Sequence, residues 1–323
     1  MCTAIRYQAD DHYFGRNLDL EYSYHETVVV TPRNKPLSFR FLPDLTQHYA
    51  MIGMAYVVDD YPLYYEATNE KGLSLAGLNF PASAFFGAGS PDKDHVAPFE
   101  LIPWILSKCS TVKEARPLLE KMDIVNEAFR PDLPVAPLHW ILDDKDDCLI
   151  LESTADGLHI YENPIGVLTN EPPFPMQSEN LARYRGLSPE EPKNSFAPGL
   201  NLTGNCHGMG SFGLPGDLSS PSRFVRAAFM LNNSVSGNSE SEAVSQFFHV
   251  LASVAHPRGS VRLGEQYEIT VYSSCCNADQ GVYYYTTYEN NQISAVDMHK
   301  TDLESKELSI YPLIKNQQFA FQN

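Results

Sequence analysis

The chain has 323 residues and a formal net charge of −17, with 40 acidic residues against 23 basic ones. This balance argues against binding to nucleic acid or to an anionic membrane surface, because both need a concentrated basic surface. The length permits either two domains or one large layered domain. No linker, low-complexity tract or fixed-period repeat divides the chain, so we expect one domain over residues 1–323.

The beginning of the chain lacks a basic segment followed by an apolar stretch, and no apolar run is long enough to span a bilayer. We therefore expect a cytoplasmic protein without membrane insertion. The cysteines lack CxxC spacing and include an adjacent pair that can hardly form an ordinary disulfide, which fits a reducing compartment. We expect structural thiols at Cys109, Cys148, Cys206, Cys275 and Cys276.

The chain begins Met1-Cys2-Thr3, and removal of Met1 would leave a cysteine with both a thiol and a free α-amino group. An α-amino group has a pKa of about 7.7–8.0, so near neutral pH it can accept the proton of the adjacent thiol. A small second residue always permits methionine removal, and a cysteine there usually has no special role. The first residues alone are therefore weak support for a nucleophile that carries its own base.

A β-hairpin is predicted directly after this start. Residues Cys2–Tyr7 alternate like a strand, and Tyr13–Asp19 reads as the returning strand, with a pair of aspartates as the turn. Such a hairpin brings Arg16 and Asp19 near Cys2, where they supply a cation that favours the thiolate and a carboxylate that can hold the N-terminal amine. A surface arginine and aspartate beside a turn is the alternative interpretation.

Three helices with recognisable ends and a series of strands are predicted further along the chain. The helices, one opened by a capping box and one by Ser-Pro, cover Thr111–Lys121, Ser220–Leu231 and Glu240–Ala255. Strands are expected near Glu26–Thr31, His48–Met54, Gly72–Ala76, Leu138–Asp143, Cys148–Thr154, Gly157–Glu162, Tyr267–Ser273 and Gly281–Thr287. This order of sheets and helices fits a layered α+β fold.

Eight short blocks distributed along the chain carry a family resemblance. They are Met1-Cys2-Thr3, Phe14–Asp19, Asn69–Leu73, Ala76–Phe80, Leu138-His139-Trp140, Gly166–Asn170, Gly213–Asp217 and Ser222-Arg223-Phe224. With these blocks in this order, the chain resembles over nearly its whole length the choloylglycine hydrolase family, which contains bile salt hydrolases and penicillin V acylases. The resemblance implies an α+β, four-layer αββα sandwich of the N-terminal nucleophile hydrolase fold, in which helices cover both outer faces of two stacked antiparallel sheets.

The same resemblance implies a chemistry. The protein is expected to hydrolyse the amide bond of glycine- and taurine-conjugated bile salts through a thioester on a cysteine, with no cofactor and no metal, and to assemble as a homotetramer. The functional set that it assigns is Cys2, Arg16, Asp19, Asn79, Asn170 and Arg223. Within this set, the Asn170 side-chain amide and the Asn79 backbone N–H would bind the oxyanion. Each asparagine could instead be an ordinary turn residue.

The substrate pocket is assigned by the resemblance alone. Family positions that line it map onto Leu18, Val58, Tyr65, Phe129, Leu133 and Leu138, all apolar or aromatic and all equally compatible with core packing. Asn79 favours bile salts, because penicillin V acylases of the family more often place tyrosine there. Arg16 and Arg223 are also expected to meet an anionic leaving group such as glycine or taurine.

Other signals point away from metals and nucleotides. Gly208–Gly213 is glycine-rich but lacks the ending of a phosphate loop, and we expect a loop beside the pocket. No paired-ligand spacing occurs, so His139 and His207 are expected to be hydrogen-bonded or solvated. Two alternatives stay open: a penicillin V acylase with the same residues, or an inactive binding protein if Met1 is retained, since an acylated nitrogen cannot act as a base.

Overall fold

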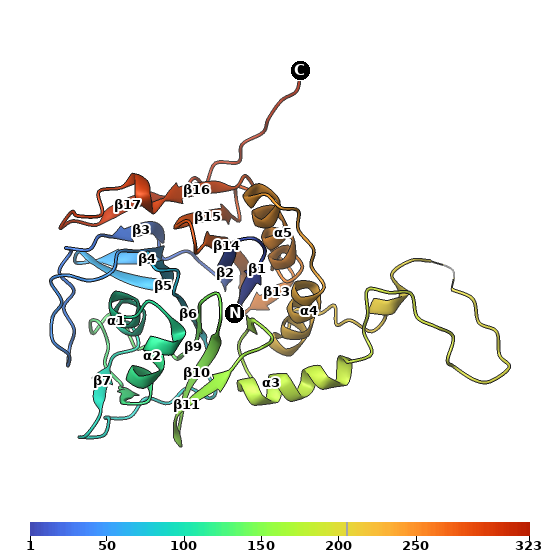
Figure 1. Ribbon diagram of the computed structural model, residues 1–323, viewed down its shortest axis with the longest axis horizontal. Helices are drawn as coiled ribbons and strands as arrows, with labels where there is room; N and C mark the ends of the chain where they lie inside the picture. The colour runs from blue at the N-terminus through green and yellow to red at the C-terminus, as the bar shows by residue number, and fades with distance from the viewer. Residues whose placement is uncertain (205) are drawn as a thin grey trace.

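Two antiparallel sheets lie face to face in the computed structural model, which describes residues 1–204 and 206–323 (Figure 1). Within this part of the chain, the spatial order of the first sheet is β12 (Val167–Leu168), β1 (Cys2–Gln8), β2 (His12–Leu20), β14 (Gln266–Asn277), β15 (Val282–Thr287) and β16 (Ser294–Asp297). A further strand, β13 (Val261–Leu263), pairs with β14. The central strands of this sheet are therefore β1, β2 and β14, which come from opposite ends of the chain.

The second sheet is built from the middle of the chain and one C-terminal strand. Its spatial order is β11 (Gly157–Glu162), β10 (Cys148–Thr154), β9 (Leu138–Asp143), β6 (Ser74–Asn79), β5 (Tyr61–Asn69), β4 (Met51–Val58), β3 (Thr27–Thr31) and β17 (Ser309–Pro312). A small parallel pair joins β7 (Asp94–Val96) to β8 (Met122–Ile124). The predicted bounds of β9, β10 and β11 are confirmed, whereas β5 was not predicted.

Helices cover both outer faces (Figure 1). The helices are α1 (Leu101–Lys108), α2 (Val112–Leu119), α3 (Phe174–Leu181), α4 (Ser220–Asn232) and α5 (Glu240–Ala252), with short 3-10 turns η1 (Ala182–Tyr184), η2 (Met209–Ser211) and η3 (Met298–Lys300). The first two pack on the second sheet, and α4 and α5 pack on the first. The predicted α+β, four-layer αββα sandwich is confirmed.

The helix ends follow from local chemistry. Thr111 caps α2 by accepting a hydrogen bond from the Glu114 N–H at 3.2 Å, and Ser239 forms a full capping box with Glu242 at the start of α5. Both helices end two or three residues earlier than predicted. The sequence analysis missed α1, which has no side-chain cap, and α3, which follows two prolines.

The strand pattern separates two hydrophobic layers. In β6, Ala76 and Leu78 face the core between the sheets, whereas Leu75 faces the layer beneath α1 and α2. This alternation is the period of two that a strand buried on both faces imposes.

The predicted first hairpin is confirmed, with Cys2 opposite Leu18 and Ala4 opposite Arg16. The close approach of β14 to β2 requires glycine at position 15, because an added Cβ would lie 2.0 Å from the Ser274 carbonyl oxygen. Since β2 lies between two strands and two layers, its polar residues are buried. A run of buried polar side chains on a central strand is unusual and marks a candidate site.

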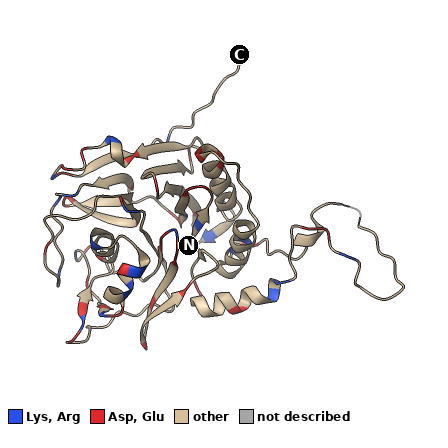
Figure 2. Cartoon of the chain, viewed as in Figure 1, with Lys and Arg blue, Asp and Glu red and all other residues tan. Residues whose placement is uncertain are grey.

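The segment between η1 and α4 extends away from the sandwich as an arm, residues 186–204 and 206–218 (Figure 1). It carries few charged residues (Figure 2) and exposes large apolar side chains at Phe196, Leu200, Leu202 and Phe212. Gly208–Gly213 belongs to this arm and does not line the cavity described below, so the expected loop beside the pocket is wrong. In the described part of the chain, we find no helix of sufficient length and apolarity to cross a membrane.

Candidate active site

A buried polar cluster surrounds Cys2, whose exposed fraction is 3%. The neighbouring groups come from β1 and β2 of the first sheet, the end of β6, the turn after β12 and the first turn of α4. The structure brings together all the residues that the sequence assigned to the functional set, which are Cys2, Arg16, Asp19, Asn79, Asn170 and Arg223.

Asn170 connects the cluster through both ends of its side-chain amide. Its Oδ1 accepts hydrogen bonds from the Cys2 N–H at 2.9 Å and from Nη2 of Arg223 at 2.7 Å. Its Nδ2 donates to the Asn79 carbonyl oxygen at 2.8 Å, and its backbone N–H donates to Ser220 Oγ at 2.9 Å. These partners fix the orientation of the amide and leave one Nδ2 hydrogen for another acceptor.

Arg223 is fully buried, and its donors go to the protein. Nη1 donates to the Cys2 carbonyl oxygen and to Thr3 Oγ1, while Nε donates to the Leu218 carbonyl oxygen. Burial lowers the pKa of Arg223, and the negative charge of Asp19, 4.0 Å from Nη1, opposes this effect. Because Arg223 does not line the cavity, the geometry does not support the expectation that it meets an anionic leaving group.

Arg16 crosses from the first sheet to the second. Its Nη1 donates to the carbonyl oxygens of Gly77 and Tyr65, which are free because β5 and β6 pair only as far as Ala76. Burial lowers the pKa of Arg16, but its electrostatic interactions with Cys2, Tyr272 and Glu66 outweigh burial and raise the pKa above its ordinary value. Within the described residues Nη2 has no hydrogen-bond partner, and Arg16 lines the cavity.

The Asn79 N–H points away from β9. The N–H of the next residue, Phe80, donates to the Pro137 carbonyl oxygen at 2.8 Å, and the orientation of backbone groups alternates along an antiparallel pair. Asn79 therefore directs both its C=O and its N–H toward the side where Asn170 lies. The backbone N–H of Asn79 and the Nδ2 of Asn170 form a pair of donors near Cys2; of these two residues, Asn79 lines the cavity described below.

The sequence analysis missed Glu66, which lies 3.9 Å from Nε of Arg16. This buried carboxylate accepts hydrogen bonds from Tyr272 at 2.7 Å, from Ser274 at 2.9 Å and from Tyr283. Burial raises the pKa of Glu66, and Arg16 and the three hydroxyl donors oppose that rise. No motif marks this group, because its partners lie about 200 residues away on β14 and β15.

A second missed group lies beside the N-terminus. Thr270 Oγ1 donates to Asp19 Oδ1 at 2.6 Å, and His256 Nε2 lies 3.9 Å from Asp19 Oδ2. Nδ1 of His256 lies 2.8 Å from Glu268 Oε1, and Oε2 of Glu268 accepts a hydrogen bond from the Met1 ammonium at 2.9 Å. The cluster is thus shaped to hold a cationic amine at the start of β1.

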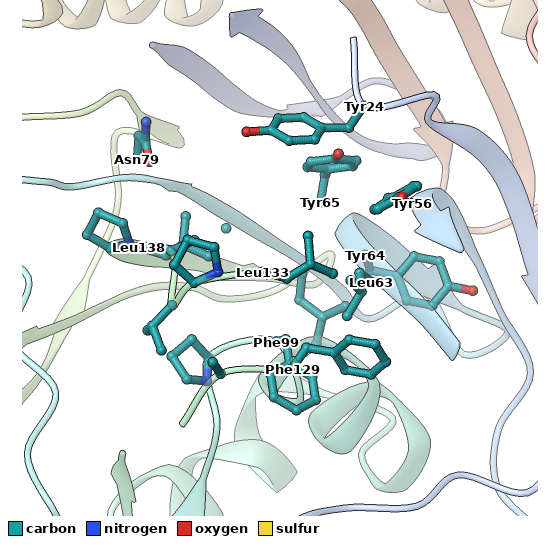
Figure 3. Close-up of a pocket in the computed structure, with 18 of the residues that line it drawn as sticks. Tyr24, Tyr56, Leu63, Tyr64, Tyr65, Asn79, Phe99, Phe129, Leu133 and Leu138 are labelled. Atoms are coloured by element: carbon teal, nitrogen blue, oxygen red, sulfur yellow. The ribbon is translucent and has the colours of Figure 1, made fainter. Parts of the chain in front are cut away.

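A cavity of about 620 Å³ adjoins Cys2, Arg16 and Asn79. Figure 3 shows Asn79 together with apolar and aromatic residues of its wall. Five of the six predicted wall residues line it, namely Leu18, Tyr65, Phe129, Leu133 and Leu138. Val58 is buried at the end of β4 but does not line the cavity, so its placement in the wall is wrong. Most of the wall is apolar, while one end carries the polar groups around Cys2.

The sequence analysis missed several aromatic wall residues. They are Tyr22, Tyr24, Tyr56, Tyr64 and Phe99. Tyr24 and Tyr65 lie on one side of the cavity, and Phe99 and Phe129 lie on the opposite side (Figure 3). The Tyr-x-Tyr pattern directly after β2 was the available signal for the first side.

Phe129 is held by its neighbours rather than by a regular element. Its ring packs edge-on against Phe99, with ring centres 5.3 Å apart, and in a tilted arrangement against Tyr61, with ring centres 5.4 Å apart. The Arg40 guanidinium lies 5.8 Å from the ring centre, and Arg40 Nη2 donates to the Phe129 carbonyl oxygen. This support orders a loop residue at the cavity wall.

No group of three potential metal ligands occurs among residues 1–204 and 206–323. Both ring nitrogens of His139 lie at hydrogen-bond distance from protein oxygens, and His207 is exposed, as predicted. All cysteines are free thiols, and burial raises the pKa of Cys109 to about 11. Cys206 is exposed.

The sandwich, with a cysteine at the start of its central hairpin, defines the class as the N-terminal nucleophile hydrolase fold. The family model "Linear amide C-N hydrolases, choloylglycine hydrolase family" matches residues 2–311, and the chain belongs to this family.

Similar proteins extend over the whole chain. It is 51% identical over 320 residues to a bile salt hydrolase/transferase of Lactiplantibacillus plantarum, covering 99% of both chains. A mutant conjugated bile acid hydrolase from Clostridium perfringens matches with a TM-score of 0.91 and 35% identity over 100% of both chains. A penicillin V acylase from Agrobacterium tumefaciens matches with a TM-score of 0.78 over 99% of this chain and 94% of its own, but at 22% identity it shows the shared fold alone.

Proposed function

We propose that this protein hydrolyses the amide bond of glycine- and taurine-conjugated bile salts. The observation that carries the proposal is the cavity of about 620 Å³, whose wall is largely apolar and whose polar end holds Cys2 and Arg16. A steroid presents a large apolar area, and its burial is the main source of binding free energy in such a site. The names of the relatives, bile salt hydrolase and conjugated bile acid hydrolase, support the same substrate class.

The first step in this proposal requires the loss of Met1. With Met1 present, the Cys2 nitrogen belongs to a peptide bond and cannot accept a proton. Without Met1 this nitrogen becomes an amine beside Asn170 Oδ1. In the structure, where Met1 is present, the same nitrogen donates a hydrogen bond to Asn170 Oδ1 at 2.9 Å. The amine takes the thiol proton, and the sulfur attacks the substrate carbonyl carbon to form a tetrahedral intermediate.

Fixed donors then stabilise the oxyanion of this intermediate. The Asn79 N–H and the remaining Nδ2 hydrogen of Asn170 are directed to the same side of β6, and both are anchored by the hydrogen bonds described above. Donors of this kind stabilise the oxyanion most strongly when their positions are fixed before the reaction. Arg16 favours the thiolate and, through its unpaired Nη2, offers a donor to the substrate.

Collapse of the intermediate breaks the carbon–nitrogen bond. The Cys2 ammonium protonates the leaving amine, which departs as glycine or taurine, and a thioester remains on the sulfur. Water then attacks the thioester while the same amine takes its proton, and the free bile acid leaves. In this proposal Asp19 and Arg223 hold the N-terminus in place, and neither a cofactor nor a metal takes part.

The test is a comparison of three amides on protein whose loss of Met1 has been verified by intact mass. We expect glycocholate and taurocholate to be hydrolysed with kcat/KM at least about tenfold above that of penicillin V, because their steroid fills more of the apolar wall. A preference for penicillin V would replace the bile salt proposal with the acylase alternative. Absence of turnover on all three would favour an inactive binding protein.

We further propose that residues 1–323 form one domain and that the protein is a cytoplasmic homotetramer. The assembly proposal is supported by the arm, whose exposed apolar side chains lack cover from the rest of the described chain. Light scattering during size-exclusion chromatography measures the mass directly, against 36.2 kDa for one chain. A monomer at micromolar concentration would contradict the tetramer.

A further inference from the structure

His139 is a buried residue that the mechanism above does not use. It lies on β9, two residues before Ile141, and both side chains point into the space between the sheets. Its Nε2 lies 3.1 Å from the Thr169 carbonyl oxygen, directly before Asn170. Its ring stacks on Phe80, directly after Asn79, with 4.2 Å between ring centres and an interplanar angle of 6°. One side chain therefore contacts the neighbour of each oxyanion donor.

Glu152 extends this contact to the far end of the Asn170 turn. Its Oε1 lies 3.1 Å from Nδ1 of His139 and accepts a hydrogen bond from the Phe174 N–H at 2.9 Å. Phe174 is the first residue of α3, which has no side-chain cap of its own. His139 and Glu152 together therefore hold the turn on both sides of Asn170, at residue 169 and at residue 174.

The hydrogen bonds of His139 require a proton at each of its two polar contacts, with Thr169 and with Glu152. A carbonyl oxygen only accepts, so Nε2 of His139 must donate to Thr169. The contact between Nδ1 and Glu152 then needs one more proton, held either by the imidazole or by the carboxyl group. The exposed fractions of the two side chains are 0% and 1%, so both partners are shielded from bulk water. Removal of either one leaves buried polar groups unpaired.

A second connection joins the same two segments on the solvent side. The Glu171 carboxylate accepts hydrogen bonds from the Ala82 N–H at 2.9 Å and from the Ser83 hydroxyl at 2.8 Å. Besides the direct hydrogen bond from Asn170 Nδ2 to the Asn79 carbonyl oxygen, the segment that follows Asn79 and the turn that contains Asn170 are thus held together at two further points. Of these, the His139–Glu152 pair is the buried one.

We propose that His139 and Glu152 are a positioning pair that holds the Asn79 and Asn170 segments in register, and thereby sets the distance between the two oxyanion donors. The proposal rests on the proposed function, since it assigns a role within that site. Neither residue touches the substrate in this account. A shift of about 1 Å in a reacting group can cost about 10²-fold in rate, so loss of the pair acts on kcat.

The test compares two buried histidines of the same fold. In His139→Phe the ring and its stacking on Phe80 are retained, while both hydrogen bonds are lost. The matched control is His12→Phe, because His12 is equally buried and pairs with Asp143 at 2.6 Å, but contacts neither oxyanion segment. We expect kcat to fall by about 10²-fold in His139→Phe with KM within about threefold. In His12→Phe we expect kcat per folded molecule to change by less than about twofold.

The Glu152 variants test the hydrogen-bond account without removing the histidine. In Glu152→Gln the amide can donate to Nδ1 of His139 and still accept from the Phe174 N–H, so we expect kcat within about threefold of the wild type. In Glu152→Leu both contacts are lost, and kcat should fall as in His139→Phe. The double variant should lose little more than either single one, because the residues act as a unit.

Alkylation of Cys2 by iodoacetamide separates positioning of the donors from damage to the nucleophile. Followed on the N-terminal peptide by mass spectrometry, its rate should be unchanged in His139→Phe. An unchanged kcat in His139→Phe, a parallel loss of kcat and alkylation rate, or equal losses in Glu152→Gln and Glu152→Leu would each overturn the proposal. Failure of the proposed function is seen separately, as absence of amide hydrolysis by the wild-type protein.

Discussion

The polar cluster around Cys2 and the apolar wall of the cavity are built in different ways. Every member of the cluster lies on or directly beside a regular element, and most of its donors and acceptors are paired within the protein. The wall around Phe129 belongs to an irregular segment, held by ring packing and one arginine. The polar end of the cavity is therefore fixed by directional hydrogen bonds, and the wall is fixed by the buried apolar area and the shapes of the packed rings.

This difference separates chemistry from recognition. Directional contacts fail when one partner is removed, because the others stay buried and unpaired. Apolar contacts fail in proportion to the area removed. Substitutions in the cluster should thus act mainly on kcat, and substitutions in the wall mainly on KM. The four predictions below test this division.

Cys2→Ser should have the largest effect. A hydroxyl has a much higher pKa than a thiol and is a far poorer nucleophile, so we expect kcat for glycocholate to fall by at least about 10³-fold. The hydroxyl fits the space of the thiol, so the melting temperature should stay close to that of the wild type. Turnover at the wild-type rate in a variant without Met1 would remove Cys2 from the mechanism.

Asn170→Ala should have the next largest effect. Loss of one oxyanion donor typically costs about 10²–10³-fold in kcat, and here the substitution also leaves Arg223 Nη2 and the Asn79 carbonyl oxygen without their partner. We expect a smaller change in KM, because this bond strengthens in the transition state. The measurement is steady-state kinetics on glycocholate. An increase in KM alone would assign Asn170 to ground-state binding.

Local sequence signals predicted the elements that carry their own caps or alternation. The helix that begins at Val112 was recognised from its Thr cap, the helix that begins at Glu240 from the helical spacing of its apolar residues, and the first hairpin from its alternating strands. The uncapped helix at Leu101 was missed, since its stability comes from packing on the second sheet. Helices and strands that are stabilised mainly by tertiary contacts have few local sequence signals by which they could be predicted.

The same limit applies to the site. The family motifs correctly predicted that Arg16 and Asn170 lie near Cys2, because the residues of a family motif are those that the shared fold brings together. The places of Glu66 and Glu268 in the site could not be predicted from the sequence, because their partners are determined by how β5 and β14 meet across the sandwich. The family resemblance assigned the Asn79 N–H as a donor, but its direction away from β9 follows only from the alternation along β6 and β9.

Phe129→Ala should act on recognition. Its ring is partly buried against Phe99 and Tyr61, so its removal takes apolar area from the steroid side of the cavity. We expect KM to rise by about 5- to 30-fold for glycocholate and taurocholate together, from about 1–2 kcal/mol of lost burial. The alkylation rate of Cys2 should be unchanged. A change in the glycine-to-taurine preference alone would place Phe129 near the amino acid part of the substrate.

Val58→Ala should have the smallest effect on kinetics, and it sharpens the boundary of the wall. Val58 is 7% exposed at the end of β4 and does not line the cavity, although family position assigned it there. Removal of two buried methyl groups should lower the free energy of unfolding by about 1–2 kcal/mol. KM for both conjugates should stay within about twofold, because no area facing the substrate is lost. Urea denaturation and steady-state kinetics on the same preparation measure both quantities. A rise in KM comparable to that of Phe129→Ala would show that the wall extends beyond Tyr56 to Val58 at the end of β4 when substrate is bound.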